Sequence, residues 1–246
     1  MPLLMDDTME EIKTASNYKF SAVKVDELGA TEYTLVTIAQ DVSGSVYSFK
    51  NEMENCLKTI LESCQRSPRA ENLLLRLVTF NETLEETHGF KMLDQVNQSD
   101  YDNILHPLGG TALYDAAQSA VEATKDYATL LYDQDFVTNA IIFIVTDGMD
   151  NGSTATPNSV KKAVEKAMQE EKLESITIVL VGVSTGTTSV SSALQEFQQK
   201  GNITQFVDIG EASPNKLAKL ANFISRSISS TSQALGSGSA SELLTF

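Results

Sequence analysis

Apolar residues along this chain form short β-branched runs that alternate with longer amphipathic segments. Runs rich in Val, Ile, Thr and Phe predict strands, whereas apolar residues recurring three and four positions apart predict helices. The predicted strands are residues 31–40, 73–80, 83–93, 139–148, 175–183 and 203–210. The predicted helices are residues 46–66, 112–130, 157–172, 191–201 and 214–230. Residues 131–138 fit neither pattern.

This alternation predicts an α/β fold: a Rossmann-like, doubly wound and mostly parallel sheet flanked by helices. Residues 139–148 are almost continuously apolar, as expected of a parallel strand that is buried on both faces. With 246 residues and 41% hydrophobic content, one large domain is sufficient. We expect an acidic N-terminal extension over 1–30, the domain over 31–232, and a flexible Gly/Ser-rich tail over 233–246.

The net charge of −15 narrows the classes of partner. Nucleic acid and anionic membranes attract clustered Lys and Arg, so we expect neither as a partner. Basic proteins or divalent cations suit this charge better. The N-terminus has no secretion signal pattern, and no apolar run approaches the ~18 residues that span a bilayer. We therefore expect a cytoplasmic protein.

The two cysteines of the chain are consistent with a cytoplasmic location. Cys56 and Cys64 lie eight residues apart on one predicted helix. Eight helical residues rise about 12 Å, which is too far for a single disulfide bond. We expect both thiols to be free and buried on the apolar face, as in a reducing cytoplasm.

Three polar segments follow predicted strands or precede predicted helices. The first supplies Asp41, Ser43 and Ser45, the second supplies Thr111, and the third supplies Asp147. In a doubly wound sheet, ligands bind beyond the carboxyl ends of the strands, where the strand order reverses. Two carboxylates and three hydroxyls offer only oxygen, which suits a hard cation such as Mg²⁺. Two carboxylates neutralise such an ion and leave it able to accept a further anionic oxygen.

These three segments resemble a known type of metal site. DVSGS, the later GGT and IVTDG resemble the metal-ion-dependent adhesion site of von Willebrand factor A domains, in order, spacing and surrounding alternation, over roughly residues 32–230. All three parts of that site are present. GGTALYDA and TDGMDNGS look more like cytoplasmic bacterial members than integrin domains. Gln40 departs from the family, which usually has an apolar residue there.

The resemblance implies roles for these residues. Ser43, Ser45 and Thr111 would contact the metal directly or nearly so, and Asp41 and Asp147 would act directly or through water. It implies Mg²⁺, although Mn²⁺ or Ca²⁺ also fit the donor set, and an Asp or Glu of a partner protein as the last ligand. It implies a binding module and no enzyme activity.

The same resemblance suggests a cellular role for the protein and the residues that surround the metal site. Cytoplasmic bacterial relatives often act as adaptors beside MoxR-type AAA+ ATPases, or in stress-response and phage-defence systems. The final helix shifts between states in some relatives. Gly44, Gly110, Asp150 and Asn151 are assigned to the partner-binding rim, although Asp150 and Asn151 could equally be plain turn residues.

Other interpretations of the first segment stay open. Asp41, Ser43 and Ser45 could simply cap the following helix. An EF-hand loop would need glycine at its sixth position, where this chain has Val46. A magnesium-dependent phosphatase could use Asp41 as its nucleophile, but the second acid expected two residues later is Ser43.

Two further expectations concern the remaining candidates. The tail, which ends in ELLTF, could anchor the chain as a subunit of an assembly while the metal site stays idle. His88 and His106 are the two histidines, and no cysteine or carboxylate pairs with either at the spacing of a zinc site. We expect both to be surface or loop histidines.

Overall fold

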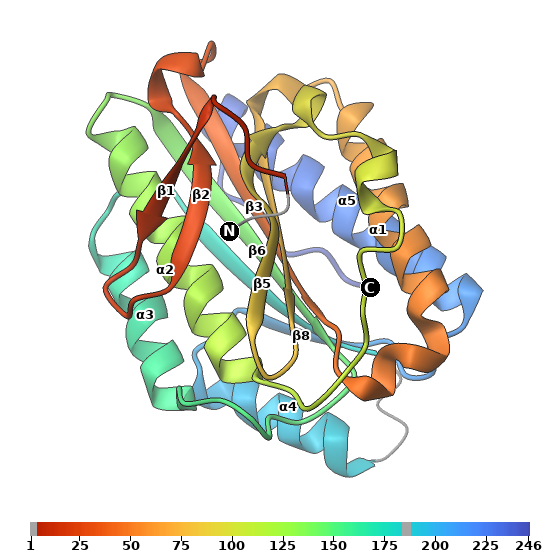
Figure 1. Cartoon of the computed structure of the whole chain (residues 1–246). Helices are drawn as coiled ribbons and strands as arrows, with labels where there is room; N and C mark the ends of the chain where they lie inside the picture. The colour runs from red at the N-terminus through yellow and green to blue at the C-terminus, as the bar shows by residue number, and fades with distance from the viewer. Residues whose placement is uncertain (1–3, 184–187) are drawn as a thin grey trace.

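The structure is a computed structural model and describes residues 4–183 and 188–246. Within these residues one sheet has the strand order β1-β2-β5-β4-β3-β6-β7-β8 (Figure 1). The strands are β1 (Met9–Lys13), β2 (Lys19–Val23), β3 (Glu32–Asp41), β4 (Leu73–Phe80), β5 (Leu84–Met92), β6 (Val137–Thr146), β7 (Ile176–Gly182) and β8 (Gln205–Asp208). The α-helices are α1 (Lys50–Gln65), α2 (Leu113–Tyr132), α3 (Pro157–Gln169), α4 (Thr188–Lys200) and α5 (Pro214–Ser237).

The sheet is mostly parallel, which confirms the predicted fold class. β3 pairs in parallel with β4 on one side and with β6 on the other. β7 and β8 continue the parallel pairing beyond β6. β4 and β5, which the sequence predicted as strands over 73–80 and 83–93, form an antiparallel hairpin. The chain leaves β3 toward β4 on one side and returns to β6 on the other, so the strand order reverses between β3 and β6.

Helices cover both faces of this sheet. α1 and α5 pack on one face, over β3 residues such as Val36 and Ile38. α2, α3 and α4 pack on the other face, over Ala39 and over Ile142 and Ile144 of β6. In Figure 1 the two helix layers lie on either side of the strands. Alternate side chains of one strand therefore enter different cores, which explains why the central strands are apolar almost throughout.

The helix expected over 46–66 begins with a separate 3-10 segment, η2 (Gly44–Phe49), and α1 starts only at Lys50. Phe49, the last residue of η2 and the N-cap of α1, has φ −134° and ψ 21°, outside the helical region, so the two helical segments are not continuous. Residues 131–138, which the pattern left unassigned, complete α2 and begin β6.

The N-terminal extension is part of the sheet. β1 and β2 form an antiparallel hairpin, and Ala22 of β2 pairs with Phe90 of β5. Gly89 allows this pairing, because a Cβ atom there would lie 1.8 Å from the Ser21 carbonyl oxygen. The hydrophobic pattern had predicted an acidic extension over 1–30 and indicated no strand within it. Residues 1–3 of that extension lie outside the described residues.

The C-terminal segment also differs from the expectation. α5 continues to Ser237, five residues past the expected domain boundary at 232, and ends at Gly238 with φ 66°. Beyond it, the Gln205 side-chain amide donates to the Leu244 carbonyl oxygen over 2.9 Å. The Phe246 ring meets Phe223 of α5 edge to face, with centroids 5.9 Å apart. The segment expected to be a flexible tail therefore contacts α5 and β8.

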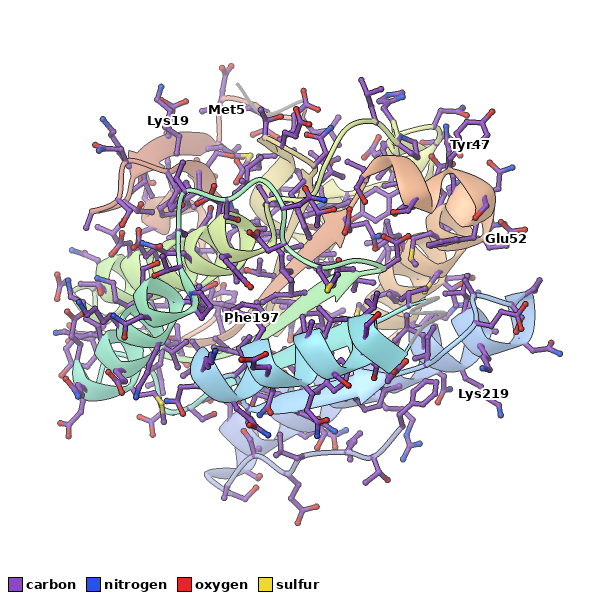
Figure 2. All side chains as sticks on the ribbon, turned by 90° about the horizontal axis from the view of Figure 1, so that it is seen from below. Met5, Lys19, Tyr47, Glu52, Phe197 and Lys219 are labelled. Carbon is purple, nitrogen blue, oxygen red and sulfur yellow. The ribbon has the colours of Figure 1, made fainter. Side chains whose placement is uncertain are left out.

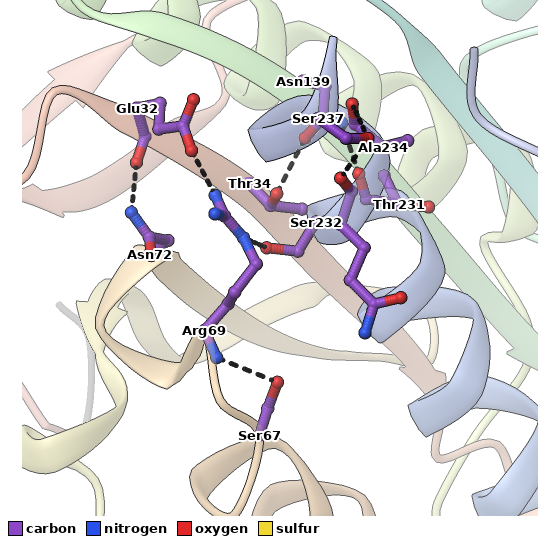
Figure 3. A network of polar contacts seen from close by, with 11 residues as sticks. Glu32, Thr34, Ser67, Arg69, Asn72, Asn139, Thr231, Ser232, Ala234 and Ser237 are labelled. Carbon is purple, nitrogen blue, oxygen red and sulfur yellow. Dashed lines mark hydrogen bonds and ion pairs between the residues drawn. The ribbon is translucent and has the colours of Figure 1, made fainter. Parts of the chain in front are cut away.

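A polar network fixes the C-terminal half of α5 to the start of the central strands (Figure 3). Arg69 Nε donates to Ser232 Oγ over 2.9 Å, and the same guanidinium pairs with Glu32 at 2.5 Å. Asn139 Nδ2 donates to the Thr231 carbonyl oxygen over 2.8 Å. These contacts lie at the amino ends of β3 and β6, the edge opposite the candidate site.

The cysteine thiols and the helices bear on two further expectations. Cys56 and Cys64 are free and buried, as predicted, and burial raises the pKa of both thiols to about 12. Among the described helices, none combines the length and the apolar character needed to cross a bilayer.

Candidate metal centre

Asp41 is the last residue of β3 and is fully buried. Both of its carboxylate oxygens accept hydrogen bonds. The Ser43 backbone N–H donates to Oδ1 over 2.7 Å, and Thr146 Oγ1 at the end of β6 donates to Oδ2 over 2.5 Å. The carboxylate therefore lies between the carboxyl ends of the two central strands, at the point where strand order reverses.

A chain of oxygen contacts leads from this carboxylate to Asp147. Ser43 Oγ lies 3.2 Å from Ser45 Oγ, and Ser45 Oγ donates to Asp147 Oδ1 over 2.8 Å. Ser43 is buried and Ser45 is exposed, so this series of oxygen contacts runs from the interior to the surface. The structure thus brings together four of the five predicted ligands through direct contacts.

Thr111 reaches the same place on a separate loop. Its Oγ1 lies 3.7 Å from the position that a Cβ atom of Gly148 would occupy, immediately after Asp147. The loop is held by backbone hydrogen bonds, since Leu108 N–H donates to the Val42 carbonyl and Gly44 N–H donates to the Gly109 carbonyl. No direct hydrogen bond joins the Thr111 hydroxyl to the other ligands among the described contacts.

The four predicted rim residues hold the site loops together. Asn151 Oδ1 accepts from the Thr111 backbone N–H over 2.7 Å, and the Asn151 N–H donates back to the Thr111 carbonyl. A Cβ atom at Gly110 would lie 2.4 Å from the same Oδ1, so a side chain there would displace the Asn151 amide from Thr111. Asp150 accepts from Ser153 Oγ, which in turn accepts the first N–H groups of α2.

Burial makes the two carboxylates unfavourable as bare anions. Burial raises the pKa of Asp41 to about 6, against the opposing hydrogen bonds from Thr146 and Ser43, and the nearby Asp147 charge adds to the rise. Burial also raises the pKa of Asp147. Of the ion pairs within the described residues, none reaches Asp41 or Asp147. A cation between them would supply the missing counter-charge.

The donor set fits a hard divalent cation. Neighbouring ligands of an octahedral Mg²⁺ at about 2.1 Å are about 3.0 Å apart. The Ser43–Ser45 and Ser45–Asp147 oxygen separations of 3.2 and 2.8 Å bracket that value. In the part of the chain that the structure describes, no group of three or more His, Cys, Asp or Glu could hold a metal. A cation here therefore depends on the serine and threonine hydroxyls.

Sequence reasoning missed three residues of the site. Thr146 precedes the motif aspartate and holds the other one, a role that its position at the end of a buried strand could have indicated. Glu82, in the β4–β5 turn, accepts from the Gly110 backbone N–H over 3.1 Å. Ser153 caps α2. For Glu82 and Ser153 the sequence offers no signal, because both act across loops that meet only in the fold.

One histidine was assigned wrongly. His88 is fully buried on β5 rather than at the surface. Its Nδ1 lies 2.9 Å from the Gly89 carbonyl oxygen and its Nε2 lies 2.8 Å from the Tyr101 hydroxyl. The hairpin turns this side chain into the core, where Tyr101 satisfies it. His106 is exposed, as expected.

Comparison with known proteins adds to the geometry. No protein-family model and no curated protein sequence matches the chain. Proximal thread matrix protein 1 from the mussel byssus is 18% identical with a TM-score of 0.53, over 79% of this chain and 45% of its own. The PilB minor pilin from Streptococcus sanguinis is 15% identical with a TM-score of 0.60, over 91% of this chain and 67% of its own.

A third structure matches over almost its whole length. BatB from Bacteroides thetaiotaomicron is 16% identical with a TM-score of 0.51, over 78% of this chain and 98% of its own. The chain has a von Willebrand A-like fold. A further structure of the mussel protein has zinc in a metal-ion-dependent adhesion site. This chain spans less than half of the mussel protein, so the likeness to it concerns the shared domain fold.

Proposed function

We propose that this von Willebrand A-like domain binds another protein through a divalent cation. The contacts that join Asp41, Ser43, Ser45 and Asp147 carry the proposal, because they connect two carboxylates and two hydroxyls from the buried Asp41 to the exposed Ser45. The zinc-bound site in the mussel protein of similar fold supports it. The partner supplies an Asp or Glu side chain.

Each residue has a distinct part in this proposal. Asp41 and Asp147 provide the negative charge, while Ser43, Ser45 and Thr111 provide neutral oxygens. Thr146 holds the Asp41 carboxylate in place from the neighbouring strand. When bound, the cation supplies an electrophilic position for the partner's carboxylate. Two ligand charges balance a divalent ion without excess, so the site does not repel a third carboxylate.

Mg²⁺ is the proposed cation. Oxygen-only donors favour hard ions, and a set with three hydroxyls favours smaller ones, although Mn²⁺ and Ca²⁺ use similar ligands. Zinc sites usually include histidine or cysteine. His88 is enclosed in the core on β5, and Cys56 and Cys64 lie buried in α1, so none of the three takes part in this donor set.

The burial of Asp41 favours binding over phosphatase chemistry. A nucleophilic carboxylate needs an oxygen that can reach a phosphorus atom, whereas Asp41 is fully buried and both its oxygens accept hydrogen bonds. Such a carboxylate can still hold a cation through a water molecule. The residue two positions later is Ser43, which cannot act as a general acid near neutral pH. We therefore propose that the chain is not an enzyme, and that it acts in the cytoplasm as an adaptor or subunit.

The test is a pull-down from a lysate of the source organism. Wild type and Asp41→Ala are compared, each with Mg²⁺ and with EDTA, and Asp26→Ala serves as a control with an exposed aspartate far from the site. A protein retained only by wild type and Asp26→Ala, and only with Mg²⁺, is the expected result. An AAA+ ATPase is one partner that this experiment can detect.

Two results would argue against the proposal. If the same proteins are retained in all conditions, the metal site is not the docking point, and the C-terminal segment becomes the next candidate. If purified wild type hydrolyses a generic phosphate ester with Mg²⁺ and Asp41→Ala does not, the site is catalytic.

A further inference from the structure

The two most exposed large apolar side chains among the described residues lie close in sequence to candidate ligands of the metal centre. Tyr47 is 76% exposed and Leu108 is 73% exposed, more than any other large apolar residue among the described ones. Met149 is 46% exposed. Each of these three residues, here called the apolar collar, lies two or three positions from a candidate ligand: Tyr47 from Ser45, Leu108 from Thr111 and Met149 from Asp147.

The collar residues come from three loops that are joined to one another. Leu108 N–H donates to the Val42 carbonyl over 2.9 Å, next to the Ser43–Ser45 segment. Consecutive Cα atoms are about 3.8 Å apart, so each collar Cα lies within about 11 Å of a ligand Cα. Figure 2 views this end of the molecule, and Tyr47 projects outward from η2. Neither packing nor chain connectivity requires these three side chains to be apolar.

Charge around the site limits the partner further. Glu82 accepts a hydrogen bond from Gly110 N–H, so an exposed carboxylate stands beside the Thr111 loop. The chain as a whole carries −15. A strongly acidic partner segment would be repelled here, and only the one carboxylate that reaches the cation would be attracted.

We propose that the site recognises a peptide segment in which a single Asp or Glu is flanked by apolar side chains, with no second acid nearby. This inference rests on the proposed function and names the class of partner that the function requires. About seven extended residues span about 23 Å, enough for a central carboxylate to reach the cation while its neighbours cover the collar. Tyr and Met are enriched at protein interfaces, and removing exposed apolar surface from water contributes to affinity.

The test uses a displayed library of peptides about nine residues long, with aspartate fixed at the centre and the other positions randomised. Peptides are captured on the full chain in Mg²⁺ and eluted with EDTA. We expect enrichment of aromatic and aliphatic residues beside the aspartate and depletion of other acids. The selected peptide should bind the variant Tyr47→Ser/Leu108→Ser/Met149→Ser at least tenfold more weakly than wild type.

Two controls separate the collar from the metal. Mg²⁺ affinity by calorimetry should be the same in the triple variant and in wild type, because no candidate ligand is changed. The variant Leu130→Ser/Met168→Ser removes exposed apolar side chains from α2 and α3, away from the site, and should bind the selected peptide like wild type.

The outcomes that overturn the inference are distinguishable from failure of the proposed function. Eluted peptides without apolar enrichment, or full binding by the triple variant, exclude the collar as a contact surface and leave metal-dependent binding intact. If EDTA elutes no peptide, or if Asp41→Ala captures the same peptides, the proposed function fails and this inference fails with it.

Discussion

At the scale of single residues, Asp41 combines two properties that rarely coexist in a stable core: full burial, and the absence of a basic partner among the described ion pairs. Its hydrogen bonds to Ser43 and Thr146 offset part of the desolvation, yet its pKa still rises to about 6. At neutral pH the metal-free protein therefore holds an unfavourable charge, which a cation would relieve.

Replacement of this carboxylate by an amide should separate stability from metal binding. At pH 7 with EDTA, we expect the free energy of unfolding of Asp41→Asn to exceed that of wild type by at most about 3 kcal/mol. The reason is that the raised pKa of Asp41 makes wild type less stable as the pH rises through about 6. Mg²⁺ should stabilise wild type and not the variant. Urea unfolding with EDTA and with Mg²⁺ measures both effects.

Asp26→Asn is the matched control and should respond to Mg²⁺ as wild type does, since Asp26 is exposed and far from the site. A variant Asp41→Asn that is less stable in EDTA and still gains stability from Mg²⁺ would contradict the assignment of Asp41 as a ligand.

His88 should give the protein a separate sensitivity to acid. Burial lowers the pKa of His88 to about 4, against an ordinary value of about 6.5. As pH falls from about 6.5 to about 4, the unfolded chain takes up a proton that the folded chain does not, so stability falls by at most about 3 kcal/mol. Urea unfolding at pH 7, 6 and 5 should show a shallower loss for His88→Gln.

The difference between wild type and His88→Gln isolates this group, because Asp41 acts in the opposite direction over the same range and is present in both proteins. Parallel pH profiles for the two proteins would show that His88 does not titrate between folded and unfolded states.

The predicted ligands can be recognised from the sequence pattern, whereas the missed residues cannot. Asp41, Ser43, Ser45 and Asp147 directly follow apolar strands, so strand ends in the sequence mark them. Glu82 reaches the site from the β4–β5 turn and His88 enters the core because of the hairpin's orientation. Those placements depend on pairing between strands, which one-dimensional patterns do not contain.

At the scale of elements, the pattern identified the strands and helices whose apolar residues face a core. β4 matches its predicted range of 73–80, and α3 and α5 begin at Pro157 and Pro214, the first residues of their predicted ranges. The sequence pattern did not predict β1, because only Met9 of its five residues is buried. An edge strand with a mostly exposed surface has no hydrophobic period from which to infer it.

The hairpin β1–β2 docks on β5 through a close backbone approach at Gly89, and that approach can be tested. We expect Gly89→Ala to lower the free energy of unfolding by about 2 kcal/mol or more, because the added Cβ would meet the Ser21 carbonyl at 1.8 Å. Limited proteolysis should then cut first within residues 4–30. Thermal unfolding and peptide mapping provide the measurements.

Gly29→Ala is the matched control, since no atom lies within 4 Å of the Cβ it would add. Equal stability of both variants would show that the hairpin does not depend on the observed pairing of β2 with β5.

At the scale of the whole molecule, the charge of −15 opposes compaction. Raising KCl from about 0.02 to about 0.5 M, with EDTA present, should raise the midpoint of thermal unfolding by a few degrees, because salt shortens the screening length from more than 20 Å to a few ångströms. Differential scanning calorimetry measures the shift. A midpoint that falls as KCl rises would show that favourable ion pairs outweigh the net repulsion.

The backbone links among the site loops have a kinetic consequence. Val42 with Leu108, Gly44 with Gly109, and Thr111 with Asn151 are joined by hydrogen bonds before any ion arrives. The conformational entropy of ordering these loops is therefore lost during folding and not during ion binding. Exchange of the cation would then be limited by its own dehydration, so attachment to a partner could follow changes in ion supply without waiting for the chain to rearrange.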